Sequence, residues 1–237
     1  MLKANFRSIL IIVLLMLCVL LPGASSAGFF DFGVKWDETY SFDKSNTFKM
    51  EIYAKNNELM KTVHMKTYYQ SNGNNFVTKM DKGGFPETVI DKKNQVAIQI
   101  WDAGRGAIPK YNAGGFTYPG ATDFKKLDIV PTSETKQIAG LACKKYTYKY
   151  KLIFGEIWIT DQVNLSNDLG VFRAAKMAAK HNTISVGGFV MEMTTEDSGG
   201  GRTLMTTVSL DNTENYMLNF KGVDMGTAIN KVNYYTF

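Results

Sequence analysis

The sequence of 237 residues has few of the residues from which catalytic and metal sites are usually built. Two cysteines cannot make a disulfide framework, and two histidines leave little choice of metal ligand. The chain also lacks the spaced catalytic motifs HExxH, CxxC, GxxxxGK and GxSxG. A hydrolase would need a nucleophile, a base and an orienting acid, and the thiol–imidazole option is Cys143 with His64 or His181. We therefore expect no catalytic residue, no metal and no cofactor, and a hydrolase of unknown type ranks third among the functions considered.

Charge is also sparse. Charged residues make up 21% of the chain and aromatic residues 13%, a balance too apolar for an intrinsically disordered protein. The formal net charge is +5, yet the lysines are interleaved with acidic residues and form no basic stripe. Nucleic acid is therefore not an expected partner.

The long apolar run of the sequence lies near the N-terminus, at residues 9–21. Lys3 and Arg7 precede it, and a Pro-Gly pair and small residues up to Ala27 follow, which is the pattern of a secretory signal peptide. The run falls short of the roughly 20 residues that a membrane-spanning helix needs. We expect cleavage after Ala27 and export, to the periplasm, the outer membrane or the medium, with no transmembrane segment afterwards. Lipidation at Cys18 is the weaker alternative, because bulky residues flank it.

After residue 27 the hydrophobic pattern has a period of two, which predicts half-buried β-strands. The alternating segments are 36–42, 47–54, 63–69, 88–90, 96–101, 145–151, 156–160, 189–193, 204–210 and 216–220. Segments 88–90 and 96–100 predict a hairpin, and the Ser-Gly-Gly-Gly of 198–201 predicts a turn. Strands so close in sequence leave no room for crossover helices, so the sheet should be antiparallel.

One segment, 168–180, has apolar residues at helical spacing and a capping residue before it. The fold predicted is therefore mainly β: a curved antiparallel sheet or half-barrel in a single domain over 28–237, with one or two helices packed on its concave face.

Residues 102–123 contain five glycines and two prolines and interrupt the strand pattern. A loop of about twenty residues is uncommon in a compact domain and is often a lid or binding element, although a decorative insertion is an equal alternative. The candidate gate residues in it are Arg105, Tyr111, Phe116 and Tyr118.

Ten of the twelve methionines follow residue 27, and several occupy apolar strand faces. Flexible thioethers adapt to varied apolar partners, so these faces could line a pocket; the simpler alternative is a packed core. The candidate ligand-binding residues are Trp36, Phe48, Met50, Ile52, Met65, Ile98, Phe189, Met191 and Met193.

The segment SETKQIAGLACKKY at 133–146, followed by GEIWIT at 155–160, resembles a family of bacterial exported proteins that has no agreed function. Segments 188–193 and 89–91 also fit its pattern, whereas Leu141 stands where an aromatic residue is usual. That family is similar in architecture to the periplasmic lipoprotein carriers and outer-membrane lipoprotein receptors of Gram-negative bacteria. The resemblance implies a curved antiparallel sheet closed over by helices, with an apolar cavity for acyl chains.

These observations predict a non-catalytic cell-envelope protein that binds an apolar ligand, such as an acyl chain or a lipidated peptide, on the concave face. The alternative is a structural or interaction module in which the loop at 102–123 contacts another envelope protein. Cys143 is expected to be a small packed side chain, inert when buried.

Overall fold

The computed structural model describes residues 33–71, 75–81, 85–102, 104, 107–118, 128–150, 152–165 and 187–226. Within these ranges the chain forms thirteen strands and no helix, which confirms a mainly β protein. No helix of the described part therefore has the length and hydropathy needed to cross a bilayer. The predicted signal segment 1–27 and the predicted helix 168–180 lie outside the described residues.

The strands all belong to one compact unit. They are β1 (Thr39–Phe42), β2 (Lys44–Tyr53), β3 (Leu59–Tyr69), β4 (Asn75–Met80), β5 (Glu87–Asp91), β6 (Val96–Trp101), β7 (Lys110–Gly115), β8 (Asp128–Ile138), β9 (Leu141–Tyr150), β10 (Ile153–Thr160), β11 (Phe189–Glu196), β12 (Arg202–Asp211) and β13 (Tyr216–Asn219).

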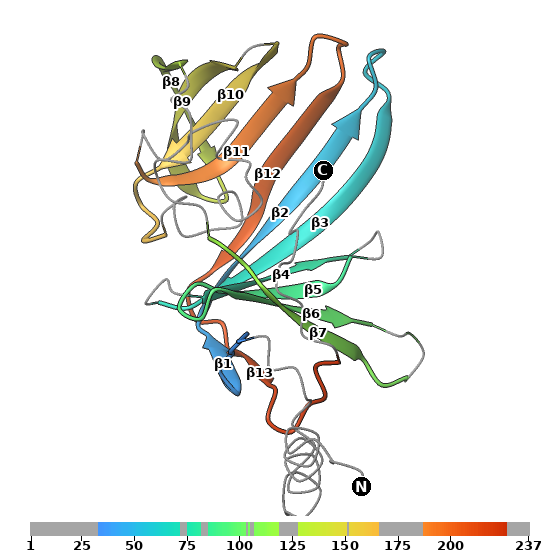
Figure 1. Ribbon diagram of the computed structural model, residues 1–237. Coiled ribbons are helices and arrows are strands. Elements are labelled where there is room, and N and C mark those ends of the chain that lie inside the picture. The colour runs from blue at the N-terminus through green and yellow to red at the C-terminus, as the bar shows by residue number, and fades with distance from the viewer. Residues whose placement is uncertain are drawn as a thin grey trace, which may run out of the picture. The chain divides into compact units, whose positions relative to one another are not determined.

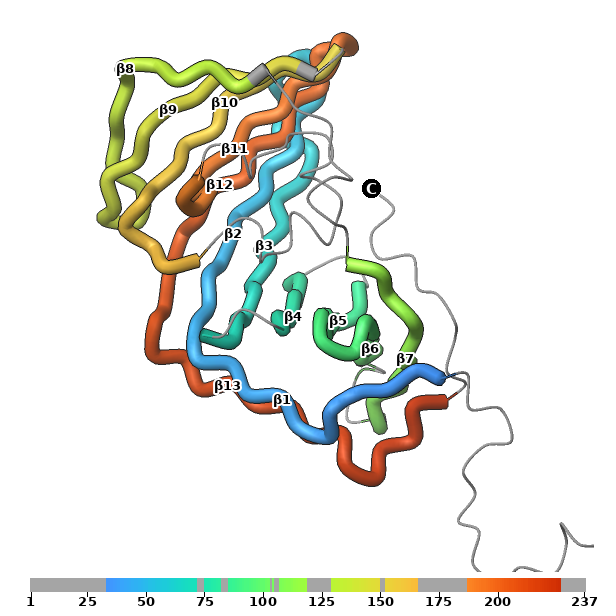
Figure 2. The backbone as a smooth tube through the Cα atoms, turned by 60° about the vertical axis from the view of Figure 1, so that its left-hand side comes forward, coloured from blue at the N-terminus to red at the C-terminus, as the bar shows by residue number. Residues whose placement is uncertain are grey.

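Eleven strands form one antiparallel sheet in the order β7-β6-β5-β4-β3-β2-β12-β11-β10-β9-β8 (Figure 1). The sheet consists of two meanders, β2 to β7 and β8 to β12, which are joined where β2 pairs with β12. Strands β1 and β13 pair with each other in a second, two-stranded sheet. Figure 2 shows that the large sheet curves around one of its faces. The predicted curved antiparallel sheet is thus confirmed; helices on its concave face are not among the described elements.

Two hydrophobic clusters lie on opposite faces of the large sheet. The inner cluster contains Phe48, Met65, Tyr69, Phe76, Ile90, Ala97, Phe116, Ile138, Cys143, Tyr148, Ile157, Trp158, Ile159, Leu165, Phe189, Val190, Met191, Met193 and Met205. The outer cluster contains Tyr40, Phe42, Tyr68, Val77, Val89, Val96, Ile98, Ala113, Phe220 and Met225. Because the outer cluster unites residues of β1 with residues of β3 to β7, the two-stranded sheet covers that part of the large sheet.

The hairpins follow from local chemistry. The predicted pair at 88–90 and 96–100 is the β5–β6 hairpin, and Asp91 pairs with Val96 across its turn. Between β8 and β9, Ala139 and Gly140 take φ values of 48° and 79°. Positive φ at both central residues is typical of the two-residue turn that matches strand twist.

The loop predicted over 102–123 is wrong in part, because strand β7 occupies Lys110–Gly115 and pairs with β6 along its length. Its sequence KYNAGG has no clear alternation, and main-chain pairing forms the strand regardless. Strand β4 and most of β8 were also not predicted. Strand β8 is an edge strand with Pro131 and many polar side chains, a usual way to protect an edge from further pairing.

Candidate functional site

A row of apolar side chains crosses six neighbouring strands on the inner face. Its central members are three methionines in register: Met50 of β2 pairs with Met205 of β12, which pairs with Met193 of β11. Val63 of β3 extends the row beside Met50. Ile157 of β10 and Tyr146 of β9 follow on the other side of Met193. Directly opposed residues in a sheet have side chains in contact, so the row is one continuous apolar band.

A second row runs beside the first. Phe48 of β2 pairs with Met65 of β3, and Met65 pairs with Met80 of β4. The ring of Phe48 also stacks on that of Phe189, with centroids 6.3 Å apart and an interplanar angle of 24°. The methionine-rich face, as we call these two rows together with Phe189 and Met191, therefore combines rigid aromatic rings with flexible thioethers.

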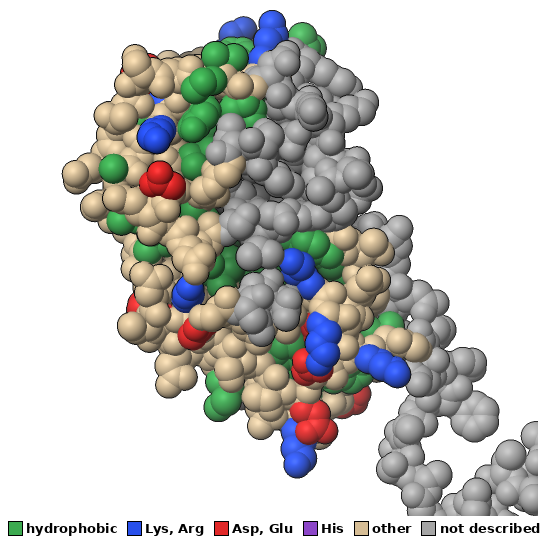
Figure 3. Space-filling view, turned by 90° about the vertical axis from the view of Figure 1, so that its left-hand side faces the viewer, with side chains coloured by type: hydrophobic (Ala, Val, Ile, Leu, Met, Phe, Trp, Pro, Cys, Tyr) green, Lys and Arg blue, Asp and Glu red, His purple; other side chains and the backbone are tan. Residues whose placement is uncertain are grey.

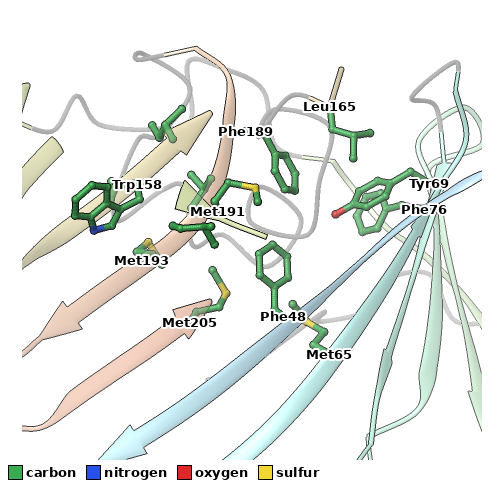
Figure 4. Close-up of a cluster of buried hydrophobic side chains, with 14 of the residues drawn as sticks. Phe48, Met65, Tyr69, Phe76, Trp158, Leu165, Phe189, Met191, Met193 and Met205 are labelled. Atoms are coloured by element: carbon green, nitrogen blue, oxygen red, sulfur yellow. The ribbon is translucent and has the colours of Figure 1, made fainter. Parts of the chain in front are cut away.

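Figure 4 shows that side chains from β10 to β12 and from β2 to β4 point toward one another. Phe189 and Met191 lie between Trp158 on one side and Tyr69 and Phe76 on the other. Side chains of a single sheet converge in this way only where the sheet bends toward them, so the inner cluster lies on the concave face. Phe48 and Met191 are 0% exposed and Met205 2%, which makes this face well packed.

Five of the nine predicted ligand-binding residues meet in the inner cluster, and Met50 packs against it. The five are Phe48, Met65, Phe189, Met191 and Met193. Their common face is visible in the sequence because they recur at every second position within β2, β3 and β11.

The remaining three predicted ligand-binding residues do not lie on the face that Phe48 and Met65 share. Ile98 lies in the outer cluster because its register aligns it with Val77 and Val89, and Trp36 packs there because it precedes β1. Ile52 is 39% exposed, since it lies next to the β2–β3 turn at the end of the sheet. The alternation within one strand shows which of its side chains share a face. It does not show whether that face lies on the same side of the sheet as the apolar face of another strand.

The predicted gate residues are also divided. Phe116 is buried in the inner cluster with Tyr118 packed against it, their rings edge to face at 6.4 Å. Tyr111 packs instead on the outer cluster. Arg105 lies outside the described residues. The three described residues are thus part of the packed structure beside the strands.

A pocket of about 630 Å³ lies at one end of the methionine-rich face. Leu141, Val163 and Leu210 line it and also pack against the inner cluster. Lys44, at the start of β2, contributes a cation, and the remaining lining includes Gln162, Asn164 and Asn212. This pocket was not foreseen, because its walls come from β2, β8–β9, the segment after β10, and β12.

Cys143 is buried in the inner cluster beside a second pocket of about 420 Å³. Burial raises the pKa of its thiol, and its Sγ donates a hydrogen bond to the carbonyl oxygen of Leu141 at 3.4 Å. The Nδ1 of His64 lies 2.9 Å from Asp81 Oδ2 on an exposed part of the sheet. His181 lies outside the described residues. The described residues therefore bring no imidazole to the thiol.

Ion pairs lie beside Trp158 on strands β8 to β11. Lys136 Nζ lies 2.5 Å from Glu192 Oε1 and 4.2 Å from the centre of the Trp158 ring. Lys145 pairs with both Glu134 and Glu156. Figure 3 shows the two signs of charge interspersed on the face it presents. Among the described residues, no group of three or more His, Cys, Asp and Glu is placed to hold a metal ion.

No family model and no curated protein matches this sequence. Among solved structures, the chain is similar to PNGF-II in two crystal forms, with TM-scores of 0.42 and 0.45 and 15% identity. The match covers 79% of this chain but 30% and 32% of PNGF-II, so this chain spans about a third of its length. A LolA superfamily protein from Nitrosomonas europaea is a distant structural neighbour, with a TM-score of 0.29 and 6% identity over 76% of this chain and 89% of that one.

Proposed function

We propose that this protein is a non-catalytic binding protein of the cell envelope that takes up an apolar ligand of the acyl-chain class on its methionine-rich face. The observation that carries the proposal is the in-register row Met50, Met205 and Met193, which places three thioethers side by side across three strands. Unbranched thioethers can repack around an inserted chain, whereas branched side chains have fewer rotamers to use. The sequence resemblance to exported proteins of carrier-like architecture points to the same class of ligand.

Because this face is closely packed, an acyl chain must displace side chains to enter. The pocket at Leu141, Val163 and Leu210 offers the entrance, since these residues join solvent to the inner cluster. A chain entering there would follow the inner face along β2 and β12 toward the row of methionines. The chemistry of the site fits binding and not catalysis, because its described side chains are thioethers, aliphatic groups and aromatic rings.

The test is methyl NMR of the full chain, delipidated and labelled with ¹³C at the methionine methyl groups. Addition of palmitate is expected to shift the signals of Met50, Met193 and Met205. Met225 in the outer cluster and the exposed Met217 are internal controls that should not move. An unchanged spectrum at saturating palmitate, or shifts confined to the two controls, would overturn the proposal and favour a structural or interaction module.

A further inference from the structure

Three polar side chains interrupt the apolar inner face where β12, β2 and β3 are neighbours. Asn46 of β2 pairs with Thr67 of β3, and both are 0% exposed. Thr207 of β12, 2% exposed, pairs with Phe48, two residues along β2 from Asn46. All three follow the parity of Phe48 and Met65, so they belong to the inner face and adjoin the methionine-rich face.

Each of the three has a buried polar atom that finds no hydrogen-bond partner among the residues that the structure describes: Nδ2 of Asn46, Oγ1 of Thr67 and Oγ1 of Thr207. The Tyr69 hydroxyl donates to Asn46 Oδ1 at 2.8 Å, which holds the amide and leaves its NH₂ group unused. Buried polar groups in folded proteins are nearly always paired with protein, water or ligand. Three such atoms on adjacent strands therefore require a partner, which is either ordered water or a bound group that accepts hydrogen bonds.

The chemistry of these atoms selects the kind of group. The Asn46 amide offers two N–H donors, and each hydroxyl offers one O–H donor. Lys44, two residues before Asn46 on the same face of β2, lines the entrance pocket and forms no ion pair with any residue that the structure describes. Leu210, which pairs with Asn46, lines the same pocket. A cluster rich in donors beside an ammonium group matches a carboxylate, which only accepts hydrogen bonds.

Along β2 the inner face thus changes in order from a cation, Lys44, to an amide, Asn46, then to Phe48 and Met50. This order is the order of an amphiphile, with its charged head at the entrance and its chain inside. We infer that the ligand is a long-chain fatty acid whose carboxylate is bound by Asn46, Thr67 and Thr207 with Lys44 at the entrance. This inference rests on the proposed function, because it places the head of the chain that the methionine-rich face would hold.

The chain offers a matched control two strands from Thr67 along the same row of the sheet. Thr67 pairs with Thr78, and Thr78 pairs with Thr88 of β5. Thr88 is as buried as Thr207, but its hydroxyl donates to the carbonyl oxygen of Pro86 at 3.2 Å. Thr88→Val therefore removes a buried hydroxyl that is already used, whereas Thr67→Val and Thr207→Val remove unused ones.

The experiment measures the affinity of the delipidated full chain for palmitate, hexadecanol and methyl palmitate by titration calorimetry. The wild-type protein is expected to favour palmitate over the other two by about tenfold or more, the contribution of hydrogen bonds to a charged group. The double variant T67V/T207V, and separately Lys44→Met, should lose that preference while binding hexadecanol as before. Thr88→Val should keep it.

Equal affinity of the wild-type protein for all three ligands would overturn the inference and leave the proposed function intact, with ordered water as the partner of the three atoms. A preference that survives T67V/T207V would overturn it as well. Failure to bind any of the three ligands would overturn the proposed function itself. If the double variant does not fold, the wild-type ligand series and Lys44→Met, a partly exposed position, still decide the matter.

Discussion

Strands β4 and β5 of the large sheet use their two faces differently from its central strands β2 and β12. In β4 and β5, neighbouring residues are buried on opposite faces: Phe76 and Ile90 lie in the inner cluster, and Val77 and Val89 in the outer one. In β2 the apolar residues Phe48 and Met50 face inward, and the convex side carries polar groups such as the Lys49–Glu51 ion pair at 3.2 Å. A strand covered on both sides appears in sequence as an apolar run, and a strand covered on one side appears as an alternation.

Stability and the proposed ligand binding depend on different regions of the sheet. The doubly covered strands β4 to β6 are held by two clusters and by the sheet of β1 and β13. Apart from Met65 of β3 and Met80 of β4, the methionine-rich face lies on singly covered strands, where flexible side chains can move without disturbing a second layer. Four substitutions, taken in order of decreasing loss of stability, test that distinction.

Ile98→Ala should give the largest loss. Ile98 is 0% exposed beneath the two-stranded sheet, so truncation leaves a cavity that the second layer cannot fill. We expect the free energy of unfolding to fall by about 2–5 kcal/mol in urea denaturation. Ile52→Ala, the same change at a 39% exposed position of β2, should cost well under half as much. Equal losses at both positions would show that the doubly covered region is no more tightly packed.

Asp91→Ala tests the polar support beneath β1. The fully buried carboxylate accepts hydrogen bonds from the Tyr40 hydroxyl at 2.8 Å and from the amide N–H and side chain of Asn94. Its removal leaves the Tyr40 hydroxyl unpaired and should cost about 1–3 kcal/mol. A double-mutant cycle with Tyr40→Phe measures the coupling, and strictly additive losses would contradict a direct bond between the pair.

The ion pair between Lys66 and Glu214 on the convex side should make the stability of the fold depend on pH. Hydrogen bonds from Lys66 and Ser45 lower the pKa of Glu214 below its ordinary value of 4.5, and the same ion pair raises the pKa of Lys66. A depressed carboxyl pKa stabilises the fold above the unfolded pKa, and this stability is lost as the pH falls through the folded value. Melting temperatures measured from about pH 6 to about pH 2 should therefore fall less steeply in Glu214→Gln than in the wild type. Parallel curves would rule out this contribution.

Val208→Thr should have the smallest effect. Val208 lies at the bulge of β12 opposite β2 and is 47% exposed, so it adds little to either cluster. We expect a change within about 0.5 kcal/mol by the same urea measurement. A loss above 1 kcal/mol (about twice that bound) would show that a partner or ligand covers Val208, which lines the entrance pocket.

Much of the strand content was predictable because a period of two survives in strands such as β2, β3 and β11. Strands β4 and β7 were missed for opposite reasons, since β4 is buried on both faces and β7 is rich in glycine. For the site, the alternation within strands grouped Phe48, Met65 and Met193, which share the inner cluster. It also included Ile98, which lies in the outer cluster. The polar residues Asn46 and Thr67 went unnoticed, although their parity with Phe48 and Met65 was a readable signal of a polar group on the apolar face.

The sequence by itself determined the β class, the β5–β6 hairpin and the side chains that share a face within each strand, because these depend on neighbours a few residues apart. The tertiary structure alone decided that Met50 lies beside Met205 and that Asn46 lies between Thr67 and Leu210. Main-chain pairing is nearly the same for any sequence, so it does not encode which distant strands become neighbours. That choice depends on burying the apolar faces of all strands together, and the candidate site exists only once this has happened.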